Sequence, residues 1–174
     1  MLNHAFGRLA AIAAIAAAPA LAGDYDRIFD VVKETWPARD TVLAVCNMND
    51  NQLALLDLAE TAKTKGFSLM IMDLRADKDF ARTLSGVMAR DLKRAFVVLI
   101  DEDTILGVKG TRTNEWITRL RTLKGVPTVA GSEGAFKAGA ALWVPASDKD
   151  VLKARKLEIE RMDLKVPAKA VDAK

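Results

Sequence analysis

The stretch Arg94-Ala95-Phe96-Val97-Val98-Leu99-Ile100-Asp101-Glu102-Asp103-Thr104 decides the fold of this chain. Residues 96–100 are all apolar and lack the alternation of a half-buried strand. Such a run predicts a strand buried on both faces, as in a parallel sheet covered by helices. In sheets of this kind ligands sit beyond the carboxyl ends of central strands, where the strand order reverses. The acidic, hydroxyl-bearing turn at 101–104 is therefore the first place to expect a site.

Helices and strands alternate on both sides of this central strand. Hydrophobic periodicity and turn residues predict the other strands at 41–46, 67–73, 126–130 and 140–144. They predict helices at 25–36, 51–65 and 76–91, a helix through Trp116 that ends at Gly125, and one or two helical turns from Ser132. The fold class expected is α/β: a three-layer sandwich with a mostly parallel five-stranded sheet in the flavodoxin-like order 2-1-3-4-5.

The C-terminal part of the chain departs from the alternation of helices and strands in the middle. Ser147 and Asp150 have the spacing of a capping box and predict a charged last helix to about Leu164. Residues 165–174 lack apolar weight and are expected to be a flexible tail. With no internal repeat and no linker, residues 23–164 are predicted to form a single α/β domain.

Residues 1–22 have the pattern of a secretory signal peptide. Arg8 supplies the positive charge, Leu9 to Ala18 the apolar stretch, and Ala20-Leu21-Ala22 the cleavage pattern. A membrane anchor is the alternative, but the apolar run is shorter than the roughly 20 residues of a span. Asp24 stands where a lipidated cysteine would be needed. The expected product is exported and cleaved, and the expected location is the periplasm.

The composition excludes several functions. The formal net charge is +3, and the basic residues are scattered among acidic ones, which argues against nucleic-acid binding. The one histidine, His4, lies in the signal peptide, which removes Ser-His-Asp catalysis and imidazole-based zinc sites. The one cysteine, Cys46, is core filler or, alternatively, a reactive thiol. We therefore expect neither an enzyme nor a cofactor, although carboxylate pairs leave a glycosidase-like mechanism open.

The order 2-1-3-4-5 would place three polar loops around one crevice. The candidate ligand-binding residues come from these loops: Asn47, Met48, Asn49, Asp50, Asp101, Asp103, Thr104, Ser132 and Glu133. Their amide, hydroxyl and carboxylate groups can hold a small polar or amine-bearing ligand. The alternative is that residues such as Asn49, Asp50, Thr104 and Ser132 simply cap the helices that follow.

Other interpretations of the same loops are weaker. Asp101 ends a central strand as a receiver-domain phosphoacceptor does, but Asn47 and Met48 replace the acidic pair that such domains need. Residues 107–111 lack the full spacing of a phosphate loop. A divalent cation on Asp101 to Asp103 stays open, without EF-hand spacing. Trp143 is either core or an aromatic wall of the crevice.

Two segments resemble a known family. The block 96–106 is similar to the "hydrophobic strand, then Asp-x-x-Thr" segment of ABC-transporter substrate-binding proteins of the tryptophan- and tyrosine-type periplasmic class. The segment 126–140, with Val126-Pro127 and Phe136-Lys137-Ala138-Gly139-Ala140, is similar to a second family segment. Residues 47–51 fall at the polar turn after the first strand of the lobe. The resemblance covers about residues 41–145 and implies a non-catalytic, ligand-binding lobe that serves a membrane transporter or sensor.

Such receptors close two lobes on a ligand, and this chain has length for one. The resemblance therefore implies a free-standing half-receptor, with a homodimer or another protein as the second wall. The pair Trp36-Pro37 also resembles one-lobe periplasmic regulators of membrane diguanylate cyclases. That alternative is an interaction module that docks on a membrane partner without a small ligand, through an apolar patch around Met48 and Trp143.

Overall fold

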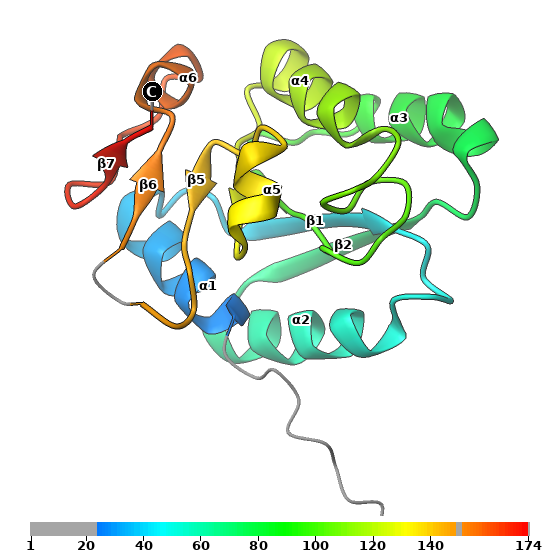
Figure 1. Ribbon diagram of the computed structural model, residues 1–174, viewed down its shortest axis with the longest axis horizontal. Helices are drawn as coiled ribbons and strands as arrows, with labels where there is room; N and C mark the ends of the chain where they lie inside the picture. Colours follow the sequence, from blue (N-terminus) through cyan, green and yellow to red (C-terminus); the bar gives the residue numbers. More distant parts are fainter. Residues whose placement is uncertain (1–23, 149–150, 174) are drawn as a thin grey trace, which may run out of the picture.

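The strands of the described chain form one sheet, drawn in Figure 1. A computed structural model describes residues 24–148 and 151–173. In these residues the sheet has seven strands in the order β2-β1-β3-β4-β5-β6-β7. The strands are β1 (Thr41–Cys46), β2 (Ser68–Asp73), β3 (Ala95–Val98), β4 (Thr128–Ala130), β5 (Leu142–Trp143), β6 (Lys153–Ala154) and β7 (Val171–Asp172).

The first five strands are parallel and confirm the predicted order 2-1-3-4-5. The central strand β3 pairs with β1 through Val42 opposite Phe96, and with β4 through Val98 opposite Val129. The prediction of five strands is wrong, because β6 adds antiparallel to β5 and β7 adds parallel to β6. The α/β class and the mostly parallel sheet are confirmed.

Helices cover both faces of this sheet (Figure 1). They are α1 (Asp24–Thr35), α2 (Gln52–Lys65), α3 (Phe80–Met88), α4 (Thr113–Lys124), α5 (Glu133–Lys137) and α6 (Lys156–Arg161), with a 3-10 turn η1 (Asp77–Asp79) before α3. The predicted helix 76–91 is thus a 3-10 turn followed by a shorter helix. Within the described ranges, none of the helices combines the length and hydrophobicity that a membrane crossing requires.

Each face of the sheet has its own core because successive strand side chains point to opposite faces. Phe96 packs with Phe29 of α1, ring centroids 6.0 Å apart, in a cluster that also holds Leu58 of α2. Val97 lies in the opposite cluster, with Trp116 of α4. The strand predicted to be buried on both faces is therefore buried on both faces.

The predicted last helix, 147–164, is wrong over most of its described length. Residues 153–154 form β6, and only Lys156–Arg161 are helical. The N–H of Arg155 donates to the carbonyl of Ala141 at 2.9 Å. The edge of β5 would otherwise expose unpaired backbone groups, and pairing them outweighs the helical preference of a charged segment. Asp150, the second half of the predicted capping box, lies outside the described residues.

Residues 165–173, expected to form a flexible tail, make contacts with the rest of the described chain. The N–H of Val171 donates to the carbonyl of Leu152 at 2.8 Å, and Ala170 is buried. Upstream, the indole N–H of Trp36 donates to the carbonyl of Lys165 at 2.7 Å. Residues 165–173 therefore complete the sheet and cover the end of α1. The predicted signal peptide, residues 1–22, lies outside the described residues.

Candidate functional site

The loops that follow β1 and β3 are joined by one buried carboxylate. Asp103 is 3% exposed and accepts four hydrogen bonds. Its Oδ2 accepts from the N–H of Asn47 at 2.8 Å and from the side-chain amide of Asn51 at 3.0 Å. Its Oδ1 accepts from the N–H groups of Ile105 and Leu106 at 2.9 and 2.7 Å. Asp103 thus holds both loops together, and both of its carboxylate oxygens are occupied.

Asn51 belongs to this arrangement and was not among the predicted site residues. It is 7% exposed, and its Nδ2 also donates to the carbonyl of Asn47 at 2.9 Å. Asn51 stands immediately before α2, where asparagine ordinarily caps a helix. Here the side chain makes no cap and reaches Asp103 in the neighbouring loop instead. An asparagine at a helix start is a signal only for a cap, so sequence reasoning had no basis for the contact with Asp103.

The turn at residues 47–50 is held by its own side chains. Asn47 donates from Nδ2 to Asp50 at 2.6 Å and accepts at Oδ1 from the N–H of Asn49 at 3.1 Å. The N–H of Met48 donates to Oδ1 of Asp73, at the end of β2, at 3.2 Å. Met48, Asn49 and Asp50 are exposed. The turn therefore has a defined shape and presents these side chains to solvent.

Asp73 carries a shifted pKa because of its neighbours. Burial on its own raises the pKa of this carboxyl. The hydrogen bonds from the Arg75 side chain and the Met48 N–H act in the other direction, and the net result is a pKa below the ordinary value. Asp73 is consequently ionised at neutral pH beside the turn.

The loop between β3 and α4 is tightly folded on itself. A Cβ on Gly107 would lie 2.3 Å from the carbonyl oxygen of Asp103 and 2.4 Å from that of Asp101, so only glycine fits. The N–H of Val108 donates to the carbonyl of Asp101 at 3.0 Å. Asp101 is half-buried, while Glu102 and Thr104 are exposed. The residues predicted here thus differ: Thr104 faces solvent and Asp103 does not.

The third loop, 131–134, lies against the second. A Cβ on Gly134 would come within 2.5 Å of a methyl group of Val108. Ser132 caps α5, accepting at Oγ from the N–H of Ala135 at 3.1 Å, so the capping alternative applies to it. Glu133 is exposed and pairs with Lys137 at 3.1 Å. The structure brings the three predicted loops together, with the Ser132 hydroxyl already used.

Trp143 and Cys46 lie at the borders of this edge. The Trp143 ring is half-buried and stacks on Phe136 with centroids 6.2 Å apart, and its Nε1 donates to the carbonyl of Gly131 at 3.2 Å. Cys46 is fully buried. Burial, followed by the charges of Asp103 and Asp73, raises the pKa of the Cys46 thiol to about 12. The thiol is therefore protonated at neutral pH and behaves as core.

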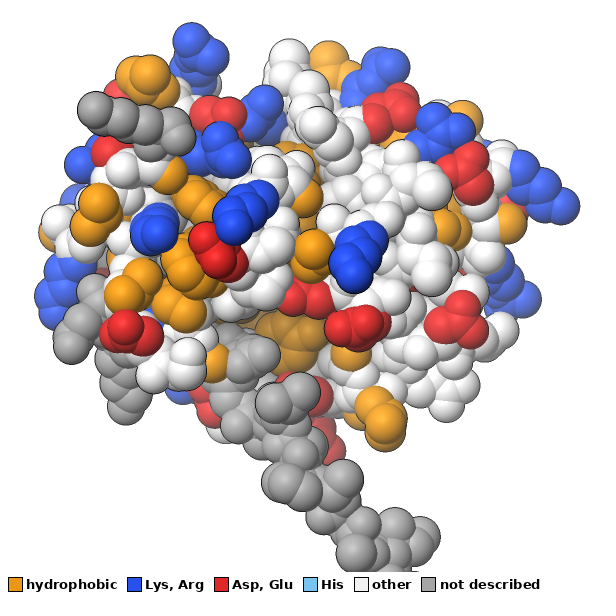
Figure 2. Space-filling model, in the orientation of Figure 1, with side chains coloured by type: hydrophobic (Ala, Val, Ile, Leu, Met, Phe, Trp, Pro, Cys, Tyr) orange, Lys and Arg blue, Asp and Glu red, His pale blue; other side chains and the backbone are white. Residues whose placement is uncertain are grey.

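The surface over the loops is polar. In Figure 2 hydrophobic side chains gather toward the β5–β6 side of the face shown, whereas the loop side carries scattered charged side chains. Around the three loops the exposed carboxylates are those of Asp50, Glu102 and Glu133. Across the part of the chain that the structure describes, no three histidine, cysteine or acidic side chains come close enough to hold a metal ion.

Comparison with known proteins gives matches at the level of structure. No protein-family model matches the chain, and no curated protein matches it. A conserved domain protein from Vibrio cholerae superposes with a TM-score of 0.65 at 15% identity, covering 87% of this chain and 60% of the other.

Two further solved structures have a similar fold. An ABC domain from Streptococcus pneumoniae in complex with L-Trp has a TM-score of 0.57 at 11% identity, covering 81% of this chain and 45% of the other. A ligand-free, open substrate-binding protein with adhesive properties from Clostridium difficile has a TM-score of 0.63 at 13% identity, covering 84% and 58%.

These matches confirm the predicted resemblance at the level of fold. The described chain shares its fold with part of each of these structures, and it spans between 45% and 60% of their length.

Proposed function

We propose that this chain is an exported, non-catalytic binding lobe that holds a small polar ligand at the edge formed by residues 47–50, 101–104 and 131–133. The observation that carries the proposal is the buried Asp103 carboxylate. Asp103 accepts four hydrogen bonds that hold two loops in place. Side chains of these loops, including Asn49, Asp50 and Thr104, face solvent. A preformed polar edge of this kind costs little further ordering when a ligand binds.

The ligand class follows from the chemistry of the exposed groups. Asp50, Glu102 and Glu133 supply carboxylates, and Asn49 and Thr104 supply an amide and a hydroxyl. Carboxylates make short, charge-assisted hydrogen bonds with ammonium groups. We therefore assign an amine-bearing small molecule. The complex of one structural neighbour with L-Trp, itself an amine, supports this class.

One lobe covers only one side of a ligand, whereas small-molecule sites usually enclose most of the ligand surface. The neighbours are longer than this chain, which supports a second wall in a complete receptor. We propose that a second copy or a separate membrane transporter or sensor supplies this wall in the periplasm. A lobe alone then binds weakly.

The residue types of the described chain support a binding role rather than catalysis. The described chain contains no histidine, and its cysteine is buried with a raised pKa. The usual general base and thiolate nucleophile are thus missing from the described residues, although carboxylates remain.

The test compares two double variants. Asp101→Ala with Thr104→Ala removes two polar groups from the edge, while Glu60→Ala with Thr64→Ala removes two from the exposed side of α2. A panel of amino acids and small amines is titrated by NMR into wild type and both variants. Loss of one or two polar contacts should weaken binding about tenfold to a hundredfold in the first variant. If the first variant binds every amine as well as wild type, the edge is not the site.

A second candidate function is docking of a protein partner. Leu53 and Leu56 of α2 are 84% and 61% exposed, and Met48 in the adjacent turn is 39% exposed. We call these three residues the α2 patch (Met48, Leu53, Leu56). Trp143, which was expected to form a patch with Met48, is half-buried and stacks on Phe136.

Native mass spectrometry of protein released from the periplasm separates the two candidates. A retained small molecule favours the ligand-binding lobe. An assembly that dissociates in Leu53→Glu with Leu56→Glu, while the fold is kept, favours docking.

A further inference from the structure

The two edge strands of the sheet differ in length and composition. At one edge, β7 has two residues and carries the charge of Asp172. At the other edge, β2 has six residues, with no proline, no glycine and no charge before Asp73. Sheets commonly protect their edges with short strands, charges, prolines or bulges. β2 pairs with β1 residue for residue along its whole length, so it has no bulge either. Of the two edges, β2 is therefore the one suited to pairing with a further strand.

The hydrogen bonds between β2 and β1 show which backbone groups face outward. The N–H of Ser68 donates to the carbonyl of Asp40 at 2.8 Å, and the N–H of Leu74 donates to that of Cys46 at 2.9 Å. Backbone direction alternates along a strand, so the N–H and carbonyl groups of Leu69 and Ile71 face away from β1. In the described ranges no strand pairs with β2 on that outer side.

Helix α2 exposes apolar side chains toward the same edge. Lys65 at the end of α2 pairs with Asp30 of α1 at 2.8 Å, so this side of α2 faces α1. Leu56 precedes Lys65 by nine residues, or about two and a half helical turns, and so points to the opposite side. Since α1 packs on the central strand β3 and both helices cover the same face, the side away from α1 is the β2 edge. The exposed Leu56 of the α2 patch thus lies next to the open strand.

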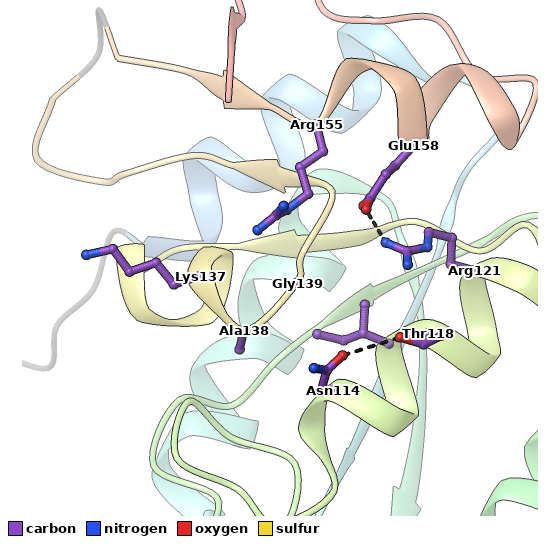
Figure 3. A pocket seen from close by; sticks show the side chains of 9 residues that line it. Asn114, Thr118, Arg121, Lys137, Ala138, Gly139, Arg155 and Glu158 are labelled. Carbon is purple, nitrogen blue, oxygen red and sulfur yellow. Dashed lines mark hydrogen bonds and ion pairs between the residues drawn. The ribbon is translucent and has the colours of Figure 1, made fainter. Parts of the chain in front are cut away.

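The opposite flank of the sheet is occupied by the chain itself. There β6 and β7 extend the sheet beyond β5, and α6 lies near α4. Arg121 of α4 forms an ion pair with Glu158 of α6, drawn as a dashed line in Figure 3. Side chains of that flank therefore pair with one another, whereas the flank formed by β2 and α2 presents apolar side chains and outward backbone groups.

We propose that a second copy of this chain docks on this flank, with the two β2 strands paired antiparallel about a twofold axis. Such an interface uses the same surface on both copies. The outward N–H and carbonyl groups of Leu69 and Ile71 in each copy then bond to outward groups of the other, and the two sheets become one continuous sheet. The axis passes close to Met70, near the middle of β2.

Helix α2 favours a second copy over an unrelated extended segment. A segment added to β2 alone would leave Leu56 exposed, whereas a second copy brings its own α2. The helix runs back along β2 and spans about 21 Å against about 20 Å for the strand, so their midpoints nearly coincide (Figure 1). Antiparallel pairing then sets Leu56 of one copy against the alkyl chain of Lys63 of the second copy, whose ammonium reaches Glu60. All three side chains are exposed, and the facing charges are of opposite sign.

This assembly names a partner for the α2 patch and does not rest on the ligand-binding function. Antiparallel pairing points the carboxyl ends of the two sets of strands in opposite directions, so neither copy covers the ligand loops of the other. The second wall of the ligand site is then supplied by a different protein. A chain that is monomeric would overturn the dimer and leave the amine titration unaffected.

Sedimentation velocity over a range of concentrations tests the assembly on the chain without its predicted signal peptide. We expect a monomer–dimer equilibrium. Leu56→Glu places a carboxylate in the apolar contact and should raise the dimer dissociation constant at least about tenfold. Leu123→Glu is the matched control, because Leu123 of α4 is 59% exposed and Leu56 is 61% exposed. A chain that stays monomeric at every concentration, or equal weakening by the two variants, would overturn the proposal.

Cross-linking locates the interface. Met70→Cys places a thiol next to the twofold axis, and wild type is the blank because Cys46 is fully buried. A short bismaleimide should join two copies of Met70→Cys and should not join two copies of Leu123→Cys. A dimer in which Met70→Cys stays unlinked, or in which only Leu123→Cys is linked, would place the interface elsewhere and overturn the assignment to β2.

Discussion

The two ends of the parallel strands are held by side chains of opposite charge. At the carboxyl ends, the Asp103 carboxylate accepts hydrogen bonds from three backbone N–H groups and one side-chain amide. At the amino ends, the Arg39 guanidinium donates to the carbonyls of Leu92, Ala95 and Gly125 at 3.3, 2.7 and 3.0 Å. One residue at each end ties together segments from neighbouring βα units.

The difference follows from the direction of the backbone. In a parallel α/β sheet the turns after the strands present N–H groups at helix starts, and the turns before the strands present carbonyls at helix ends. A carboxylate suits the first edge and a guanidinium suits the second, in the same sense as the helix dipole. The topology of the sheet therefore determines which charge suits each edge. Four predictions test this comparison between the carboxyl and the amino ends of the strands.

The largest effect is expected for Asp103→Ala. The substitution leaves four donors without an acceptor, and we expect it to lower the free energy of unfolding by about 3–5 kcal/mol. Urea unfolding measures the change. Asp50→Ala is the control at the same edge, since Asp50 is exposed and should cost less than about 1 kcal/mol. Equal losses in the two variants would mean that Asp103 does not hold the loops.

Arg39→Met should have the next largest effect. Three carbonyls lose a donor, and about 2 kcal/mol of the free energy of unfolding should be lost. The exposed Arg90, changed to Met in the same way, should leave stability within about 0.5 kcal/mol of wild type. If Arg39→Met lowers the free energy of unfolding no more than Arg90→Met does, Arg39 does not hold the amino end as Asp103 holds the carboxyl end.

The Cys46 thiol, at the carboxyl end of β1, should make the free energy of unfolding depend on pH. Its folded pKa of about 12 lies above the value of 9.0 for an unperturbed thiol. Between these values the unfolded chain loses a proton that the folded chain keeps, so stability is complete below pH 9 and falls as pH rises toward 12. The decline should be roughly 1 kcal/mol per pH unit. Urea unfolding at several pH values should show a shallower decline for Cys46→Val, and an unchanged slope would contradict the assignment.

Ser132→Ala should have the smallest effect. It removes the side-chain acceptor of the Ala135 N–H at the start of α5, a cap worth about 1 kcal/mol. Thermal unfolding measures the loss, and Ser85→Ala on the exposed side of α3 is the control. A loss as large as that of Asp103→Ala would show that the third loop, and not Asp103, dominates this edge.

The sequence predicted the parts of the fold that rest on hydrophobic pattern. The strand 41–46 and the end of α2 at Lys65 match the structure because their apolar residues and Gly66 carry the signal. β6 and β7 were missed because two-residue strands have no readable period and depend on the edge that β5 offers. Proximity of the three loops followed from strand order.

The sequence did not predict which residues of those loops are buried and which are exposed. Asp103 and Asp101 are both acidic and follow the same strand, yet Asp103 is buried and Asp101 half-buried. In this loop, which packs closely around Gly107, the Asp103 carboxylate points inward and accepts from the backbone N–H groups of Ile105 and Leu106. Burial at that scale depends on tertiary contacts, which spacing along the chain does not encode.

The contacts of α1 join segments that lie far apart in the sequence. Arg27 of α1 donates to the carbonyls of Pro145, Asp148 and Val151, and Trp36, just after α1, donates to Lys165. The residues joined are 118 to 129 positions apart. During synthesis α1 therefore emerges well before the segments that it contacts. Contacts this distant slow folding, because a long loop has to close before they form.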